Sequence, residues 1–168
     1  MQVAKKFRTS GEHTKFAVGE RKNAVCLPNK SNFVLGKSEV LYDETDIALL
    51  AYGSMIPTAL AVREELKELH YQCSLINARF AKPLDEELLL SLSADHKLLV
   101  TLEENVITGG FGQQVTQYLT DTGQPIKVLQ IAIPDEFVEQ GSVGRLREET
   151  GLDAASIVKR IIVEYIGM

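Results

Sequence analysis

The sequence predicts an α/β domain in which a mostly parallel sheet lies between layers of helices. Short, continuous apolar runs, typical of strands buried on both faces, recur along the chain. Helical patterns of about 10 to 15 residues alternate with these runs, and such alternation implies right-handed crossovers between parallel strands. With 168 residues, of which 45% are hydrophobic and 24% charged, the chain is expected to form one globular domain of ordinary size.

The first half of the regular region is expected to hold strands on either side of one helix. FVLGKSEVLY, residues 33–42, is an extended segment, and DIALLAY, residues 46–52, is a continuous apolar run. A helix follows over 56–70, because Pro57 suits a first helical turn and leucines recur near one face. QCSLINARF, residues 72–80, is the next strand.

The second half continues the alternation. A helix is expected from Pro83 to His96, with acidic residues in its first turn, where the helix dipole favours anions. KLLVTLEE is the third buried strand, and GGFGQQVTQYLTDTG is the helix after it, which Gly123 ends. Asp153 is expected to cap the final helix. The remaining elements are a strand and two helices, at 125–133, 142–151 and 152–166.

Charge is distributed unevenly along the chain. Residues 1–30 contain seven Lys or Arg against two Glu, whereas the remainder contains 11 basic and 21 acidic residues. An acidic body repels phosphates and most anionic surfaces, so neither nucleic acid nor a membrane is an expected partner. The basic head, residues 1–33, is either an electrostatic arm or, as we favour, a solvated leader.

Nothing in the sequence predicts export or membrane insertion. No apolar run approaches the roughly 20 residues of a membrane helix, and the N-terminus lacks the apolar stretch of a secretory signal. Two cysteines, Cys26 and Cys73, form no disulfide framework and are expected to be reduced thiols. A cytoplasmic location is therefore expected.

The stretch TLEENVITGGFGQQV places two carboxylates at a strand end and a glycine cluster at the start of a helix. Backbone N–H groups at a helix start can hold an anion. However, the spacing fits neither a dinucleotide fingerprint nor a P-loop, and Glu103 and Glu104 would oppose a bound phosphate. We favour a tight strand-to-helix turn in which Gly109, Gly110 and Gly112 permit close approach of a neighbouring backbone.

The remaining chemistry-bearing residues do not compose an active site. Glu103 and Glu104 are adjacent on an extended chain, so they point to opposite faces and cannot act as one acid/base pair. Each is expected either to accept hydrogen bonds from the glycine-loop amides or to lie exposed. Arg79 ends another strand, and we expect its guanidinium to pair with one of these two carboxylates rather than bind substrate. His70 and His96 are expected at helix ends or on the surface, and no His/Cys spacing resembles a metal site.

Several of these stretches together resemble a known family. INARFAKPLDEELL and LLVTLEENVITGGFGQQV are similar to the C-terminal domain of transketolase-like, thiamine-diphosphate-dependent enzymes. LGKSEVLYDETDIALLAYGSM and the tail VLQIAIPDEFVEQGSVGRLREETGLDAASIVKRI resemble this domain in the 1-deoxy-D-xylulose-5-phosphate synthase family. The resemblance covers residues 34–168. FAVGERKN, upstream, weakly resembles a segment whose arginine binds substrate phosphate, but Gly19 stands at that position.

The resemblance implies a three-layer α/β/α fold with a five-stranded, mostly parallel sheet and one antiparallel edge strand. It implies a transferase that condenses pyruvate with glyceraldehyde 3-phosphate for isoprenoid and thiamine biosynthesis, using thiamine diphosphate and magnesium. In that family the first two domains hold the cofactor, and the third packs against the second and supports a homodimer.

This chain is expected to lack the cofactor-binding domains and to be inactive alone, with no catalytic, cofactor or metal residues of its own. Its expected partners are those missing domains. The residues expected at a domain interface are Arg79, Glu103, Glu104, Gly109, Gly110 and Gly112. Two alternatives stay open: a subunit of a split transketolase-like enzyme, and a free-standing module that binds a partner protein or a small regulator.

Overall fold

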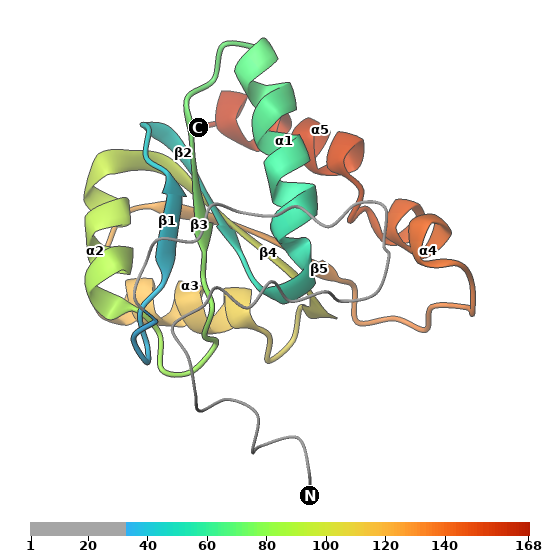
Figure 1. Cartoon of the computed structure of the whole chain (residues 1–168), viewed down its shortest axis with the longest axis horizontal. Coiled ribbons are helices and arrows are strands. Elements are labelled where there is room, and N and C mark those ends of the chain that lie inside the picture. The colour runs from blue at the N-terminus through green and yellow to red at the C-terminus, as the bar shows by residue number, and fades with distance from the viewer. Residues whose placement is uncertain (1–32) are drawn as a thin grey trace, which may run out of the picture.

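The computed structural model describes residues 33–168 and contains a five-stranded sheet in the order β1-β3-β2-β4-β5 (Figure 1). β1 pairs with β3 antiparallel at one edge, and the other three pairings are parallel. The fold class expected from the sequence is therefore confirmed. Of the expected basic leader, all but Phe33 lies outside the described residues. The strands are β1 (Glu39–Tyr42), β2 (Asp46–Ala51), β3 (Cys73–Asn77), β4 (His96–Val106) and β5 (Lys127–Ile133).

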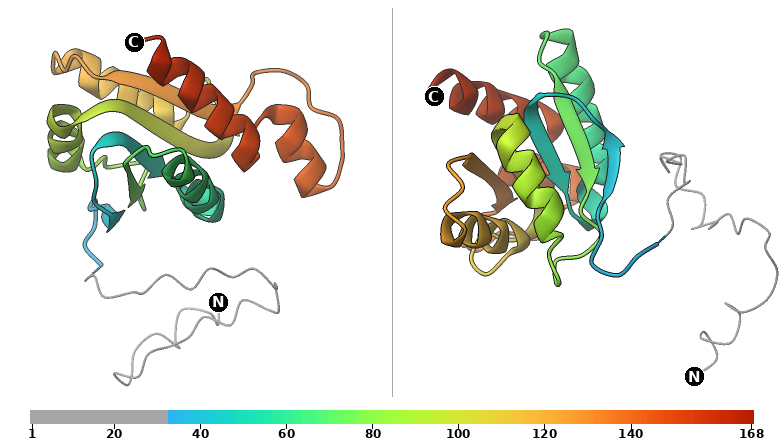
Figure 2. Two further views of the ribbon diagram at one scale, coloured as in Figure 1. Left: turned by 90° about the horizontal axis from the view of Figure 1, so that it is seen from above. Right: turned by 90° about the vertical axis from the view of Figure 1, so that its left-hand side faces the viewer.

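Helices cover both faces of the sheet (Figure 2). α1 and α5 pack against one face, and α2 and α3 pack against the other. A short 3-10 helix, η1, precedes α1, and α4 lies beyond the carboxyl ends of the strands (Figure 1). The helices are η1 (Gly53–Met55), α1 (Ile56–Glu68), α2 (Glu86–Asp95), α3 (Phe111–Asp121), α4 (Val143–Thr150) and α5 (Ala154–Ile166).

The continuous apolar runs form strands buried on both faces, as predicted. Successive side chains of a strand point to opposite faces, so Ile47 and Leu49 of β2 pack toward α1 and α5. Ala48 and Leu50 pack toward α2 and α3. All four are almost fully buried. The central strands therefore tie the two halves of the core together.

Helix α2 starts later than its sequence suggested. It begins at Glu86 rather than near Pro83, and Asp85 is its N-cap residue. The Asp85 carboxylate does not cap the helix, because it accepts the Ser38 backbone N–H at 2.8 Å and pairs with Lys37 at 3.0 Å. Asp85 thus joins the segment before β1 to the start of α2.

Two predicted helix ends are confirmed, and one histidine predicted at a helix end or on the surface lies at a helix end but is buried. Asp153 accepts the Ser156 backbone N–H at 3.0 Å and caps α5, and Gly123 follows α3 with a φ of +68°. His96 was expected at a helix end or on the surface; it does end α2, as its C-cap residue, but it is buried, and β4 begins with it. Its Nδ1 lies 3.1 Å from the Leu92 carbonyl oxygen, and its Nε2 lies 2.9 Å from Ser74 Oγ.

Candidate domain-interface site

The predicted site residues of β4 and the following turn gather at the carboxyl end of the sheet. Glu103 and Glu104 point to opposite faces, as their adjacency on an extended strand requires. Glu103 turns toward α3 and is 1% exposed, whereas Glu104 is half-buried and turns toward η1 and α4. The two carboxylates therefore have separate surroundings and separate roles.

The Glu103 carboxylate occupies the N-terminus of α3. Its two oxygens accept the backbone N–H groups of Phe111 at 2.8 Å and Gly112 at 2.7 Å. Asn105 Nδ2 donates to it at 3.1 Å. An external phosphate would need the same amides, since the first N–H groups of a helix are its anion-binding groups. The chain thus supplies its own anion here, which agrees with the interpretation of this stretch as a structural turn.

The glycines of this turn are required for close approach. A Cβ at Gly110 would lie 2.6 Å from Glu103 Oε1 and 2.8 Å from the Val106 carbonyl oxygen. A Cβ at Gly112 would collide with the Thr101 hydroxyl. At Gly109 a Cβ would meet no atom within 4 Å, but the backbone φ is +77°. Glycine is therefore favoured there by the backbone conformation rather than by lack of space. The prediction that these glycines permit close approach of a neighbouring backbone is confirmed at Gly110, next to the Val106 carbonyl oxygen, whereas at Gly112 the close neighbours are the Thr101 and Gln130 side chains.

Glu104 connects three segments that are distant in sequence. It accepts a short hydrogen bond from Ser54 Oγ of η1. Glu104 Oε1 also accepts hydrogen bonds from the Arg147 guanidinium of α4, with distances of 2.7 Å to Nε and 2.5 Å to Nη2. Burial by itself would raise the pKa of Glu104, but the hydrogen bond from Ser54 and the Arg147 guanidinium outweigh it and hold this pKa below its usual value. Sequence reasoning missed Ser54 and Arg147, which carry no local pattern.

Arg79 does not pair with either β4 carboxylate, so the expected partner was wrong. Its guanidinium pairs with Glu39 of β1 at 2.6 Å, and it lies 5.8 Å from the Phe33 ring centroid. The reason is the strand order: β4 follows β3 in the chain, but β2 lies between them in the sheet. Arg79 therefore stabilises the antiparallel edge.

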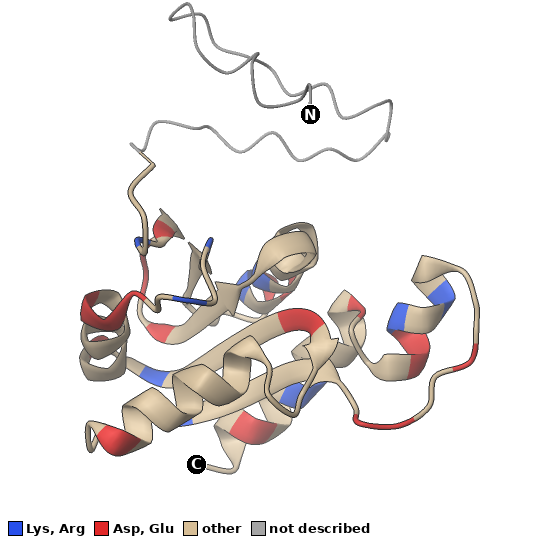
Figure 3. Cartoon of the chain, turned by 90° about the horizontal axis from the view of Figure 1, so that it is seen from below, with Lys and Arg blue, Asp and Glu red and all other residues tan. Residues whose placement is uncertain are grey.

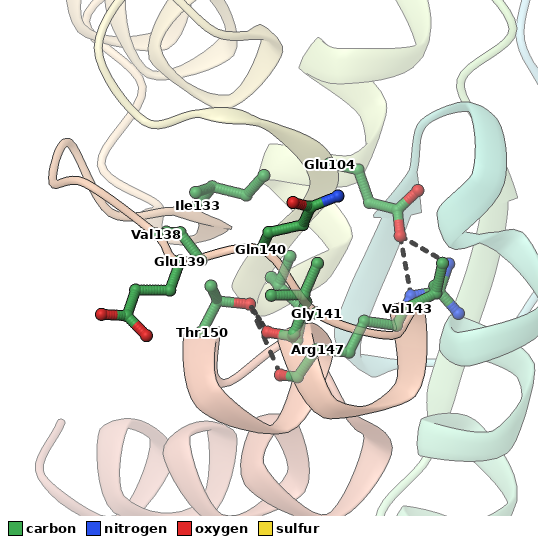
Figure 4. A pocket seen from close by; sticks show the side chains of 11 residues that line it. Glu104, Ile133, Val138, Glu139, Gln140, Gly141, Val143, Arg147 and Thr150 are labelled. Carbon is green, nitrogen blue, oxygen red and sulfur yellow. Dashed lines mark hydrogen bonds and ion pairs between the residues drawn. The ribbon is translucent and has the colours of Figure 1, made fainter.

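A cavity of about 480 Å³ lies next to Glu104, between the end of the sheet and α4 (Figure 4). The Glu104 and Arg147 side chains meet on one side of it. Most of the remaining lining is aliphatic, from Ile133, Val138, Val143, Leu146 and Leu152. This cavity was not expected from the sequence, because the loop after β5 and α4 enclose it only in three dimensions.

The resemblance assigns thiamine diphosphate and magnesium to the other domains of the family rather than to this one. Among residues 33–168, no three or more His, Cys, Asp or Glu side chains lie together in a way that could hold a metal ion. The Cys73 thiol is free and buried, and burial raises its pKa to about 12. None of the helices over this range is long and apolar enough to cross a membrane. No residue is therefore assigned to magnesium or to a diphosphate group.

The sequence matches one known protein family and is similar to several longer enzymes. Residues 36–157 match the family described as transketolase, C-terminal domain. The 1-deoxy-D-xylulose-5-phosphate synthase of Lachnoclostridium phytofermentans is 49% identical over 134 residues, which are 79% of this chain and 21% of the relative. The same-named protein of Nitrosospira multiformis is 41% identical over 148 residues, covering 88% and 22% of the two chains. The chain spans about one fifth of the length of these relatives.

Solved structures agree with this relationship. A split gene transketolase, described as an inactive beta4 tetramer, superposes with a TM-score of 0.70 and 29% identity, covering 77% of this chain and 41% of that one. The transketolase of Campylobacter jejuni superposes with a TM-score of 0.58 at 18% identity over 76% of this chain and 18% of its own length, which shows a shared fold. The chain belongs to the transketolase C-terminal domain family.

Proposed function

We propose that this chain acts as the C-terminal domain of a 1-deoxy-D-xylulose-5-phosphate synthase. The whole enzyme would be the transferase that condenses pyruvate with glyceraldehyde 3-phosphate on the route to isoprenoids and thiamine. This domain would support packing and dimer formation and would be inactive alone. The observation that carries the proposal is the 49% identity to a 1-deoxy-D-xylulose-5-phosphate synthase over 79% of this chain. The Glu103 carboxylate takes the α3 amides that a phosphate or diphosphate would need, which supports a structural rather than a cofactor-binding part for this domain.

Thiamine diphosphate and magnesium would then be held outside this domain, by the cofactor-binding domains that are its proposed partners. The carboxyl end of the sheet would face those domains; there Gly109 is exposed and Glu104 half-buried, while the Arg79 side chain is largely covered by its pair with Glu39. Glu103, Gly110 and Gly112 are buried within the domain, so their contribution to such an interface would be to hold the turn in place. Assembly and turnover would take place in the cytoplasm.

A hybrid enzyme tests this proposal. Residues 34–168 would replace the matching segment of the Lachnoclostridium phytofermentans synthase, with which the chain is 49% identical. We expect the hybrid to keep pyruvate-dependent turnover, the same relative without this segment to lose it, and the 168-residue chain alone to show neither thiamine diphosphate binding by calorimetry nor turnover. An inactive but dimeric hybrid, or cofactor binding by the chain alone, would overturn the assignment.

A second candidate is a subunit of a split transketolase-like enzyme. The similarity to the split gene transketolase chain, at 29% identity, favours it. In this case the cofactor-binding domains would be separate chains. Affinity purification of the tagged chain from its own cells separates the candidates, because a split enzyme would yield a second, stoichiometric chain that binds thiamine diphosphate.

A further inference from the structure

We propose that the cavity beneath α4 is a docking socket, and that it receives an apolar side chain from a segment of the neighbouring cofactor-binding domain that also carries Lys or Arg. This inference rests on the proposed function, because that function supplies the neighbouring domain. Three features of the described residues support it: the packing of α4, the lining of the cavity and the charge of its rim.

Helix α4 is incompletely packed in this domain. It has eight residues, none of them buried, and Val143 in its first turn is 65% exposed. An isolated helix of this length is marginal in water. Its C-terminal end is tied to the domain by Leu152, which is buried and donates its N–H to the Arg147 carbonyl oxygen at 2.7 Å. The Arg147–Glu104 pair holds the middle of the helix, but within residues 33–168 no hydrogen bond or ion pair joins residues 143–145 to another element, so the exposed Val143 is left for a partner to cover.

The cavity lining favours an apolar side chain over a small polar molecule. Small-molecule sites combine apolar walls with a few convergent polar groups that orient the ligand. Here Glu104 and Arg147 are paired with each other, and Thr150 Oγ1 donates to the Leu146 carbonyl oxygen at 2.7 Å. Glu139 points its carboxylate away from the Glu104–Arg147 pair (Figure 4). Gln140 is the other polar residue of the lining, and it is exposed to solvent. The main unmatched feature of the cavity is therefore its aliphatic wall.

The loop between β5 and α4, together with α4 itself, borders the cavity and is here called its rim; Glu139 lines the cavity, whereas Asp135, Glu136 and Glu148 lie elsewhere on this rim. The acidic charge of the rim indicates the charge of the partner. Acidic residues follow the loop between β5 and α4 and continue into the helix (Figure 3). Both arginines of α4 are already paired, Arg145 with Glu149 at 2.6 Å and Arg147 with Glu104. Within residues 33–168, no ion pair engages the other four carboxylates of this stretch, which are Asp135, Glu136, Glu139 and Glu148. A basic partner segment complements such a rim.

The loop itself adds an exposed aromatic side chain. Phe137 is 95% exposed and lies between the acidic residues of the rim. An aromatic side chain exposed to this degree beside an apolar cavity is a common feature of protein–protein contacts. The partner can therefore contact both the apolar cavity and the exposed Phe137 ring.

Hydrogen exchange in the hybrid enzyme tests the proposal directly. Amides of residues 143–150 should exchange about tenfold or more slowly in the hybrid than in the 168-residue chain, because docking suppresses local opening of α4. Amides of α2, which contributes no residue to the cavity, should exchange equally in both. Val143→Asp should abolish the added protection and lower the melting temperature of the hybrid but not of the chain alone.

Matched variants separate the effect of the cavity and its rim from the general effect of a new charge on an exposed helix. Val163→Asp changes an equally exposed valine of α5, 66% exposed, and should leave α4 protection intact. The double change Glu136→Lys and Glu139→Lys should weaken protection, whereas Glu65→Lys with Glu68→Lys on α1 should not. Equal exchange of α4 in the hybrid and the chain would overturn the docking proposal. A chain that sediments as a dimer until Val143→Asp is introduced would also overturn it, because a second copy would then fill the socket. Turnover of the unmodified hybrid reports separately on the proposed function.

Discussion

Replacing Gly110 with Ala is expected to destabilise the domain far more than a typical surface substitution. The new Cβ would lie 2.6 and 2.8 Å from the two Glu103 oxygens and 2.8 Å from the Val106 carbonyl oxygen, so the carboxylate or the backbone must shift. A shifted Glu103 loses its bonds to two α3 amides, and bonds of this charged type contribute about 1.5 to 3 kcal/mol each. The expected loss is therefore about 3 to 6 kcal/mol of unfolding free energy.

Urea denaturation followed by circular dichroism measures this loss, with the slope of the transition as a check that the denatured state is unchanged. Gly109→Ala is the matched control. Its φ of +77° makes alanine costly by about 1 kcal/mol, but no atom lies within 4 Å of the new Cβ. If Gly110→Ala costs no more than Gly109→Ala, then Glu103 is not held in the way described, and the explanation of the turn is wrong.

Three further predictions follow from individual contacts. Gly112→Ala should destabilise the domain by about 1 to 3 kcal/mol, and adding Thr101→Ala should recover part of that loss, because the Thr101 hydroxyl is the obstacle; a double-mutant cycle in urea measures the coupling. Asp153→Ala should cost about 1 kcal/mol by removing the cap of α5, which thermal unfolding detects, whereas Asp153→Asn should cost less. Glu104→Gln should cost about 1 kcal/mol at neutral pH. Because the folded-state pKa of Glu104 is lowered, the advantage of the wild type should be complete above the ordinary value of 4.5 and disappear as the pH falls through the lowered pKa. An advantage that persists unchanged at lower pH would contradict the role of this ion pair.

The sequence by itself determined the class of fold and the local chemistry of its turns. Continuous apolar runs such as 46–52 are compatible with strands covered on both faces, and the helical patterns between them require crossovers, so a parallel sheet between helices follows. The cap at Asp153 and the helix end at Gly123 also depend on near neighbours alone. The glycine cluster after Glu104 could be interpreted as a close-packed turn for the same reason.

Only the tertiary structure decided which segments meet across the sheet. Burial patterns specify the faces of a strand but not its lateral neighbours, so the insertion of β2 between β3 and β4, which separates Arg79 from the β4 carboxylates, had no signal in the sequence. Glu39 becomes the partner of Arg79 because β1 pairs with β3. The pairing of Glu104 with Arg147 spans 43 residues and depends on where α4 comes to lie. The burial of His96 follows from its place at the start of β4 rather than from its residue type. The cavity beneath α4 exists because these long-range contacts hold the helix at the end of the sheet while its first turn remains uncovered.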